Sequence, residues 1–305
     1  MKILITGGAG FIGSNVADAY IADGHQVTII DNLSTGCREF INPNASFIEK
    51  DICDNDIVDI FTECRFDAVL HFAAQIDVRK SVADPRFDVQ VNISGSVNIL
   101  EAAARAGIKK FLFASTGGAL YGEQDYFPAD EKHPIRPISP YGVAKASVEK
   151  YMFYYYAQYG LDAVALRLAN IYGQRQNPLG EAGVVAIFTH KMLRGEQAYI
   201  HGSGLQTRDY VNVLDVVQAF RLALGLNGFH ILNIGSGIET DVITLFDEIN
   251  RLTGGRTSRQ HKSAAAGEQQ RSAIESRLAK EMMGWEPKID LKTGLLMTVE
   301  WFRKQ

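Results

Sequence analysis

A tyrosine and a lysine four residues apart are the first candidates for chemistry. Tyr141 and Lys145 belong to the segment Tyr-Gly-Val-Ala-Lys, after Pro140, and on a helix this spacing places both side chains on one face. Free tyrosine has a pKa of about 10 and is a poor base at neutral pH. A nearby ammonium favours the phenolate. The spacing therefore predicts a general base, Tyr141, with Lys145 as its partner.

Two hydroxyl residues precede this pair by about 25 positions. Ser115 and Thr116 follow the apolar residues 111–114, and a buried strand is predicted at residues 110–115. In a parallel α/β sheet, ligands bind at the carboxyl ends of the strands. We therefore expect one of these hydroxyls at the site, and the spacing leaves open which one.

Glycines 7, 10 and 13 lie between an apolar strand, residues 2–6, and a helical segment, residues 15–23. In such a turn, glycines permit the tight bend, the approach of a pyrophosphate and close packing of helix on strand. The helix N-terminus offers N–H groups and a positive dipole end to phosphates. The pattern predicts a dinucleotide site.

The next strand, residues 26–30, ends at Asp31. A carboxylate there accepts hydrogen bonds from a ribose 2′-hydroxyl and repels a 2′-phosphate. Residues 32–34 contain no arginine, and Arg38 is several positions further on. NAD is therefore predicted in preference to NADP.

These groups must be held by alternating strands and helices. Further strands are predicted at 46–49, 68–73 and 163–169, and helices at 86–106 and 139–159, with Gly107 and Gly160 as stops. This alternation predicts an α/β fold with a Rossmann-type, doubly wound parallel sheet. We expect residues 1–170 to form the NAD-binding domain, with a return segment at about 211–236 (helix 211–224, strand 229–234). The smaller C-terminal α/β substrate lobe comprises 171–210 and 237–305.

The composition narrows the class of protein. The chain has 305 residues, 46% of them hydrophobic, and a net charge of −4, which does not favour nucleic acid as a partner. It has no apolar run long enough for a membrane span, and it begins with a core strand, so we expect neither membrane insertion nor a signal peptide. Three cysteines without CxxC spacing predict reduced thiols and a cytoplasmic location. Seven histidines without ligand spacing predict no metal.

Several segments together resemble a known superfamily. Residues 7–13, 71–75 (His-Phe-Ala-Ala-Gln), 115–122 and the Tyr141/Lys145 pair are similar to the extended short-chain dehydrogenases/reductases. Residues 167–173, 180–185, 207–211 and 284–287 resemble the nucleotide-sugar epimerases, above all UDP-glucose 4-epimerases. The resemblance runs from Lys2 to about Phe302.

The resemblance implies roles for individual residues. Tyr141 matches the catalytic base, Lys145 its partner, and Thr116 the catalytic hydroxyl. Ser115 is the alternative, because relatives place that hydroxyl four residues before Tyr121, where this chain has Gly117. NAD-contacting positions are Gly7, Gly10, Phe11, Ile12, Gly13, Asp31, Asn32, Asp51, Ile52, Phe72, Ala73, Ala74 and Asn92, together with Tyr141 and Lys145. Positions for the UDP-sugar substrate are Thr116, Tyr141, Asn170, Val185, His201, Arg208, Glu268 and Ser272.

The resemblance also implies a reaction. Tyr141 takes the proton of the sugar 4-hydroxyl, directly or through Thr116, while C4 gives a hydride to NAD and later receives it back on the other face. Ser272, or Arg271 as the alternative, flanks the sugar 2-substituent. Many relatives have an arginine where this chain has Ala265. We therefore expect Arg208 to bind the diphosphate, with Arg271 as a second candidate.

Other functions stay open at this point. A 4-epimerase for a uronate is one, and a dehydratase or decarboxylase is another, although Gly117 and Gly118 offer no acid after the hydroxyl pair. A non-catalytic dinucleotide sensor would usually lack the tyrosine or the lysine. A homodimer is expected through the helices near 86–106 and 139–159, where one helical stripe carries Val148, Tyr151, Met152, Tyr155 and Tyr159.

Overall fold

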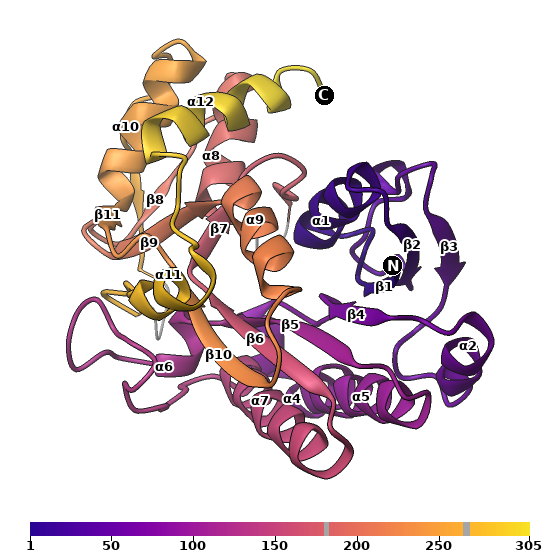
Figure 1. Ribbon diagram of the computed structural model, residues 1–305. Coiled ribbons are helices and arrows are strands. Elements are labelled where there is room, and N and C mark those ends of the chain that lie inside the picture. Colours follow the sequence, from indigo (N-terminus) through magenta and orange to yellow (C-terminus); the bar gives the residue numbers. More distant parts are fainter. Residues whose placement is uncertain (180–182, 265–268) are drawn as a thin grey trace.

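The computed structural model describes residues 1–179, 183–264 and 269–305. In these residues a parallel sheet of seven strands runs in the order β3-β2-β1-β4-β5-β6-β10 (Figure 1). The order reverses between β1 and β4, which is where doubly wound sheets bind their ligands. The predicted Rossmann-type α/β fold is confirmed. The strands are β1 (Lys2–Thr6), β2 (Gln26–Asp31), β3 (Ser46–Glu49), β4 (Ala68–His71), β5 (Lys110–Thr116), β6 (Asp162–Leu168) and β10 (Phe229–Ile234).

Helices cover both faces of this sheet because the strand side chains alternate. Ile3 and Ile5 of β1 belong to one core cluster, and Leu4 belongs to the other. The first cluster includes α1 (Phe11–Ala22) and α9 (Val213–Ala223). The second includes α2 (Ile57–Cys64), α5 (Ser96–Arg105) and α7 (Pro140–Tyr159).

Three predicted boundaries were wrong for local reasons. The strand predicted at 68–73 ends at His71, which pairs with Thr6, the last residue of β1, through a 3.0 Å hydrogen bond from Phe72 N to Thr6 O. The first helix begins at Phe11, four residues early, with Gly10 as its N-cap. The helix predicted to begin at Val211 begins at Val213, because Asn212 ends a strand and its side chain caps the helix.

The predicted helix 86–106 is divided into three segments. It consists of α4 (Pro85–Asp88), a π-helical stretch (Val89–Gly95) and α5, and α3 (Val78–Ala83) precedes it. Asp84 starts α4 by accepting a hydrogen bond from Phe87 N at 3.0 Å. A π-helical turn is rare and often marks a functional site.

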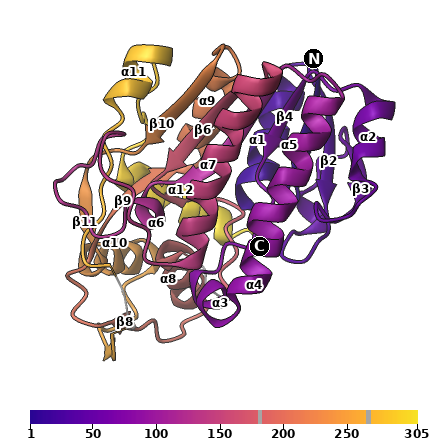
Figure 2. The same cartoon turned by 90° about the horizontal axis from the view of Figure 1, so that it is seen from below.

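The aromatic stripe of α7 also differs from the prediction. Val148, Met152 and Tyr155 are buried in the core beneath the sheet, whereas Tyr151 and Tyr159 are exposed. Helices α5 and α7 pack side by side (Figure 2), and Tyr155 Oη donates to Glu101 Oε2 at 2.7 Å. The stripe is therefore mainly an internal contact.

A second group of elements packs around the core residues Phe188, Phe246 and Leu295. A small sheet in the order β11-β9-β7 and the pair β12-β8 lie here, with the helices above them in Figure 1. The division into a domain and a lobe at the predicted residues stays a prediction. These elements are β7 (Asn170–Tyr172), β8 (Ile200–His201), β9 (Thr207–Asn212), β11 (Glu239–Asp241), β12 (His261–Lys262), α8 (Val184–Leu193), α10 (Val242–Thr253) and α12 (Leu291–Phe302).

Three short elements complete the chain: the 3-10 turn Arg38–Phe40, α6 (Gly118–Tyr121) and α11 (Arg277–Met283). Among the helices in the described part of the chain, none is long and apolar enough to cross a membrane.

Candidate active site

The glycine turn between β1 and α1 is a backbone cradle. Gly7 has a φ of +69°, and a Cβ there would lie 2.5 Å from Ala73 N. A Cβ at Gly13 would overlap the Gly7 carbonyl oxygen. Only glycine fits these positions, and no side chain caps the start of α1 at Gly10. The N–H groups of the first helical turn are thus available to a phosphate.

Asp31, the last residue of β2, is hydrogen-bonded to the glycine turn. Its Oδ2 accepts a hydrogen bond from Ala9 N at 3.0 Å, and its Oδ1 accepts one from Leu33 N at 2.8 Å. A carboxylate has about four acceptor sites, so Asp31 keeps capacity for ribose hydroxyls. The structure therefore places the predicted ribose carboxylate directly beside the predicted phosphate site.

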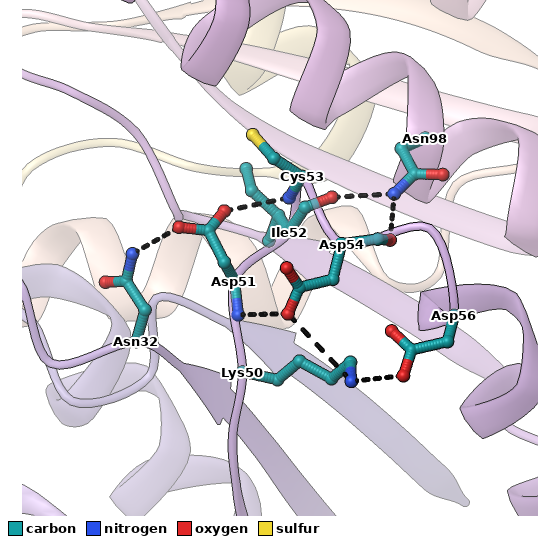
Figure 3. Close-up of polar contacts among 8 residues, drawn as sticks. All are labelled: Asn32, Lys50, Asp51, Ile52, Cys53, Asp54, Asp56 and Asn98. Carbon is teal, nitrogen blue, oxygen red and sulfur yellow. Dashed lines mark hydrogen bonds and ion pairs between the residues drawn. The ribbon is translucent and has the colours of Figure 1, made fainter.

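Three of the predicted NAD-contacting positions, Asn32, Asp51 and Ile52, come together after the ends of β2 and β3 (Figure 3). Asn32 Nδ2 donates to Asp51 Oδ2 at 2.7 Å, and Cys53 N donates to Asp51 Oδ1 at 2.8 Å. Burial alone would raise the pKa of Asp51, but these hydrogen bonds outweigh it and lower the pKa. Asn98 of α5 donates to Ile52 O at 2.8 Å. Sequence reasoning missed Asn98, which holds the loop that carries Asp51 and Ile52.

The predicted positions after β4 close the other side of the cradle. Ala73 N donates to Thr6 Oγ1 at 3.3 Å, which fixes this backbone against β1. The Phe72 ring packs on Phe220 of α9, with centroids 4.6 Å apart. Ala74 follows and is partly exposed.

Asn92 of the π-helical stretch holds protein atoms instead of facing outward. Its Nδ2 group donates to Gln75 O at 2.8 Å and to Asp88 Oδ1 at 2.9 Å, and its Oδ1 accepts from Gln75 N at 2.8 Å. Both amide hydrogens are thereby used. Sequence reasoning missed Gln75 and Asp88, because their connection to Asn92 depends on tertiary contacts.

Lys145 is fixed at the end of β5. Ser139 caps α7 by accepting from Gly142 N at 3.2 Å, and one turn later Lys145 Nζ donates to Ala114 O at 2.9 Å. Nζ lies 5.8 Å from the centroid of the Tyr141 ring. Lys145 is 4% exposed, and burial lowers its pKa to about 7, with Asp88 and Glu149 opposing this shift.

Tyr141 is a phenol, not a phenolate, in the protein without ligands. Burial raises its pKa, and the charge of Asp88 raises it further. Lys145 is expected from the sequence to lower the pKa of Tyr141, but burial and Asp88 determine the direction of the shift. The backbone of Tyr141 is held by a 3.3 Å hydrogen bond from its N to Ser81 Oγ of α3.

Ser115 and Thr116 have different surroundings although they are neighbours on β5. Ser115 is 3% exposed, and its Oγ donates to Glu149 Oε1 at 2.6 Å. Glu149 also pairs with the buried Arg167 at 2.7 Å. Thr116 is partly exposed, and its Oγ1 accepts from Ala119 N at 3.4 Å. The alternation of strand side chains sends the two hydroxyls to opposite sides.

The predicted substrate positions are spread over the second group of elements. Ser272 is buried, and its Oγ would lie 3.4 Å from a Cβ on Gly118, next to the Thr116 loop. Val185 is buried in the core with Phe188. Asn170 and His201 are exposed on β7 and β8. Glu268 lies outside the described residues.

The two arginine candidates for the diphosphate differ. Arg271 is paired with Glu239, with Nη2 to Oε2 at 2.5 Å, and lies 3.8 Å over the Phe127 ring. Arg208 Nη1 donates to Thr207 O at 2.8 Å. The adjacent Asp209 accepts from Gly237 N at 3.0 Å and Ile274 N at 3.3 Å. Asp209, which sequence reasoning missed, thus ties the Arg208 strand to the segment that follows Ser272.

Comparison with known proteins assigns this arrangement to a family. A curated relative, "Putative UDP-glucose 4-epimerase" from Methanocaldococcus jannaschii, is 46% identical and covers 99% of this chain and 98% of its own. The UDP-glucose 4-epimerase of Mycolicibacterium smegmatis is 40% identical and covers 100% of this chain and 99% of its own. A crystal structure of UDP-glucose 4-epimerase with UDP-glucose from Thermotoga maritima matches with a TM-score of 0.98 and 48% identity, covering 100% of this chain and 99% of that one. Residues 3–235 match the NAD dependent epimerase/dehydratase family, and the chain belongs to that family.

Proposed function

We propose that this protein is a UDP-glucose 4-epimerase that interconverts UDP-glucose and UDP-galactose with tightly bound NAD. The observation that carries the proposal is the Tyr141–Lys145 pair, held at the end of β5 by the Lys145–Ala114 hydrogen bond. It is supported by similarity over essentially the full chain to proteins named UDP-glucose 4-epimerase.

The cradle around Gly7 and Gly13 fits a dinucleotide, because glycine at both positions lets the turn pack tightly against Ala73 and the Gly7 carbonyl, the close packing that a pyrophosphate-binding turn requires. Asp31 then holds the ribose, and Asn32, Asp51 and Ile52 hold the adenine side. When bound, NAD supplies the hydride acceptor and donor. The protein supplies orientation and proton transfer.

In the proposed reaction, Tyr141 Oη takes the proton of the sugar 4-hydroxyl. It returns the proton after the 4-keto sugar has rotated to present its other face. Lys145 stabilises the phenolate through its positive charge. Thr116 Oγ1 is the hydroxyl that connects Tyr141 to the sugar, since the Ser115 hydroxyl is donated to Glu149. Arg208 is the arginine we assign to the diphosphate, as the family resemblance implies, and Arg271, which is paired with Glu239, is the second candidate.

The dehydratase or decarboxylase alternative is less supported by the site. Those enzymes need an acid directly after the catalytic hydroxyl. A Cβ at Gly117 would lie 2.7 Å from Ile274 Cδ1, so a carboxylate side chain does not fit there without repacking Ile274.

We propose a homodimer, formed by the outer surfaces of α5 and α7. Val143, Tyr151 and Tyr154 of α7 expose large apolar surfaces in the single chain, and α5 lies beside them. Exposed aromatic residues that cluster in this way are typical of protein interfaces. The proposed interface is therefore the outer face of α7, which includes Tyr151 of the predicted stripe but not its buried members Val148, Met152 and Tyr155.

A cytoplasmic location is the accompanying proposal. All three cysteines, Cys37, Cys53 and Cys64, are free thiols, which is typical of a reducing compartment.

The test is an NMR assay of purified enzyme with UDP-glucose, UDP-N-acetylglucosamine, UDP-glucuronate and dTDP-glucose. We expect UDP-galactose from UDP-glucose at equilibrium, without net release of NADH. Turnover of UDP-glucuronate alone would replace the proposal with a uronate epimerase. A 4-keto-6-deoxy product from dTDP-glucose would replace it with a dehydratase.

A further inference from the structure

A buried carboxylate lies on α4, which packs against α7, the helix that carries Tyr141 and Lys145. Asp88, the last residue of α4, is 0% exposed. Its Oδ1 accepts hydrogen bonds from Gln75 Nε2 at 3.0 Å and Asn92 Nδ2 at 2.9 Å. Its Oδ2 is buried with no hydrogen-bond partner. An unpaired buried carboxylate oxygen is costly, so its presence calls for an explanation.

The side chains of Gln75 and Asn92 hold this carboxylate in place but offer no hydrogen-bond donor to its Oδ2 atom. Gln75 uses its remaining polar atoms on Asp77: Nε2 donates to Asp77 O at 2.9 Å, and Oε1 accepts from Asp77 N at 2.7 Å. Asn92 uses its second amide hydrogen on Gln75 O. Neither amide therefore has a donor left for Oδ2 of Asp88.

The charge of Asp88 acts on both members of the catalytic pair. It raises the pKa of Tyr141 and the pKa of Lys145. Burial raises the pKa of Asp88 itself, while Gln75, Asn92 and Lys145 lower it. Asp88 on α4 and Lys145 on α7 are thus opposite charges on two helices that pack against each other.

The other charged groups around Lys145 do not replace Asp88. Glu149 is already paired with Arg167 and accepts from Ser115. His71 of β4 is neutral, because burial, and then the charge of Lys145, lowers its pKa to about 3. A buried ammonium needs a negative partner, and Asp88 is the carboxylate here that no arginine neutralises in the described residues.

We propose that Asp88 is a positioning residue for this pair: its carboxylate supplies a negative charge that favours the positive charge of Lys145, and Gln75 and Asn92 hold that carboxylate in place. The inference rests on the proposed roles of Tyr141 and Lys145. It adds a buried electrostatic support that acts through Lys145 without touching the sugar. The π-helical turn has a function in this arrangement, because it presents Asn92 to both Gln75 and Asp88.

The direct test measures the ionisation of Lys145 in the full-length enzyme labelled with 13C-lysine. The Lys145 resonance is assigned by its loss in Lys145→Arg. We expect Asp88→Asn to lower the Lys145 pKa by about 1 or more, the size typical of a lost opposite charge. Asp88→Glu should restore it. Asp59→Asn, which removes an exposed carboxylate on α2, is the matched control and should leave it unchanged.

The kinetic test is the pH profile of kcat. Asp88 raises the pKa of both Tyr141 and Lys145. The acid limb and the alkaline limb of this pH profile should therefore both move to lower pH in Asp88→Asn. At a fixed pH on the alkaline limb, the rate should fall about tenfold relative to wild type if the Lys145 pKa drops by about 1. A merely structural role would lower kcat at every pH and leave the limbs in place. If Asp88→Asn does not fold, Asp88→Ser removes the same charge with a smaller side chain.

If Asp88→Asn leaves both the Lys145 pKa and the limbs of the pH profile unchanged, the proposal for Asp88 is overturned. Failure of the proposed function has a different signature. A Tyr141→Phe enzyme with normal turnover removes the base assignment, whatever Asp88 does to Lys145. The NMR titration still decides the role of Asp88 in that case, since it does not depend on activity.

Discussion

The side chain of Lys145 donates to the backbone oxygen of Ala114 at 2.9 Å, across 31 residues of sequence. This hydrogen bond fixes the start of α7 against the end of β5, just before Ser115 and Thr116. The helix spacing sets Tyr141 relative to Lys145, and the bond to Ala114 sets both relative to the sheet. The candidate base and its lysine are therefore held against the strand that ends in the candidate hydroxyl, Thr116.

Replacing Tyr141 by Phe should abolish most turnover. The variant removes the proposed base and keeps the ring, so kcat should fall by about 10²–10⁴-fold, while NAD content is unchanged because the glycine turn is intact. Coupled assays and cofactor release on denaturation measure the two quantities. Tyr151→Phe on the same helix is the control and should be active. Near-normal epimerisation by Tyr141→Phe would refute the mechanism.

The two hydroxyls of β5 should behave differently. Thr116→Val should lower kcat strongly with little change in melting temperature, because its hydroxyl is assigned to the reaction. Ser115→Ala should mainly destabilise the fold, by about 1–3 kcal/mol, since buried Glu149 loses a donor. Measuring kcat and unfolding free energy for both variants tests the assignment. The reverse pattern would transfer the catalytic role to Ser115.

Gly7→Ala should lose NAD through a clash. Gly7 and Gly107 share a φ of +69°, but a Cβ at Gly7 would lie 2.5 Å from Ala73 N, whereas Gly107 has open space. Both substitutions carry the left-handed backbone strain of about 1–2 kcal/mol. The difference between Gly7→Ala and Gly107→Ala isolates the clash, and NAD content with melting temperature reports it. Equal effects would mean that the close approach to Ala73 is unimportant.

Ser272 should set the size of the accepted sugar. Its small side chain lies beside Gly118, so we expect wild type to turn over UDP-N-acetylglucosamine as well as UDP-glucose. Ser272→Tyr should lose the acetylated substrate by steric clash and largely keep UDP-glucose, whereas Ser272→Ala should keep both. Comparison of kcat/KM for the two substrates tests this. Rejection of UDP-N-acetylglucosamine by wild type would place the size limit elsewhere.

A charge on the outer face of α7 should dissociate the proposed dimer. Tyr154 is 47% exposed in the single chain, so Tyr154→Glu should fold and become monomeric, because a buried unpaired charge destabilises an interface. Met152 is 0% exposed, and Met152→Glu should instead unfold the protein. Light scattering and thermal melts distinguish these outcomes. A monomeric wild type would end the dimer proposal.

Local patterns in the sequence were enough to predict the fold and several parts of the site. The strand, the spaced glycines and Asp31 occur within one βαβ unit, so their geometry follows from short-range rules. The four-residue spacing of Tyr141 and Lys145 is likewise a property of one helix. Alternating apolar strands and amphipathic helices predicted the doubly wound sheet, because burial on both faces requires that pattern.

What only the tertiary structure decided depends on contacts between distant segments. Periodicity along α7 does not say which face meets the sheet, so Met152 and Tyr155 turned inward against the prediction. The partner of Ser115 is Glu149, 34 residues away, and this contact shows which of the two hydroxyls of β5 is already bonded within the protein. Asp88 accepts hydrogen bonds from Gln75 of the loop after β4 and from Asn92 of the π-helical turn, two segments that are separate in the sequence. Hydrogen bonds of this kind form only once the layers have packed, because burial excludes water as the competing partner.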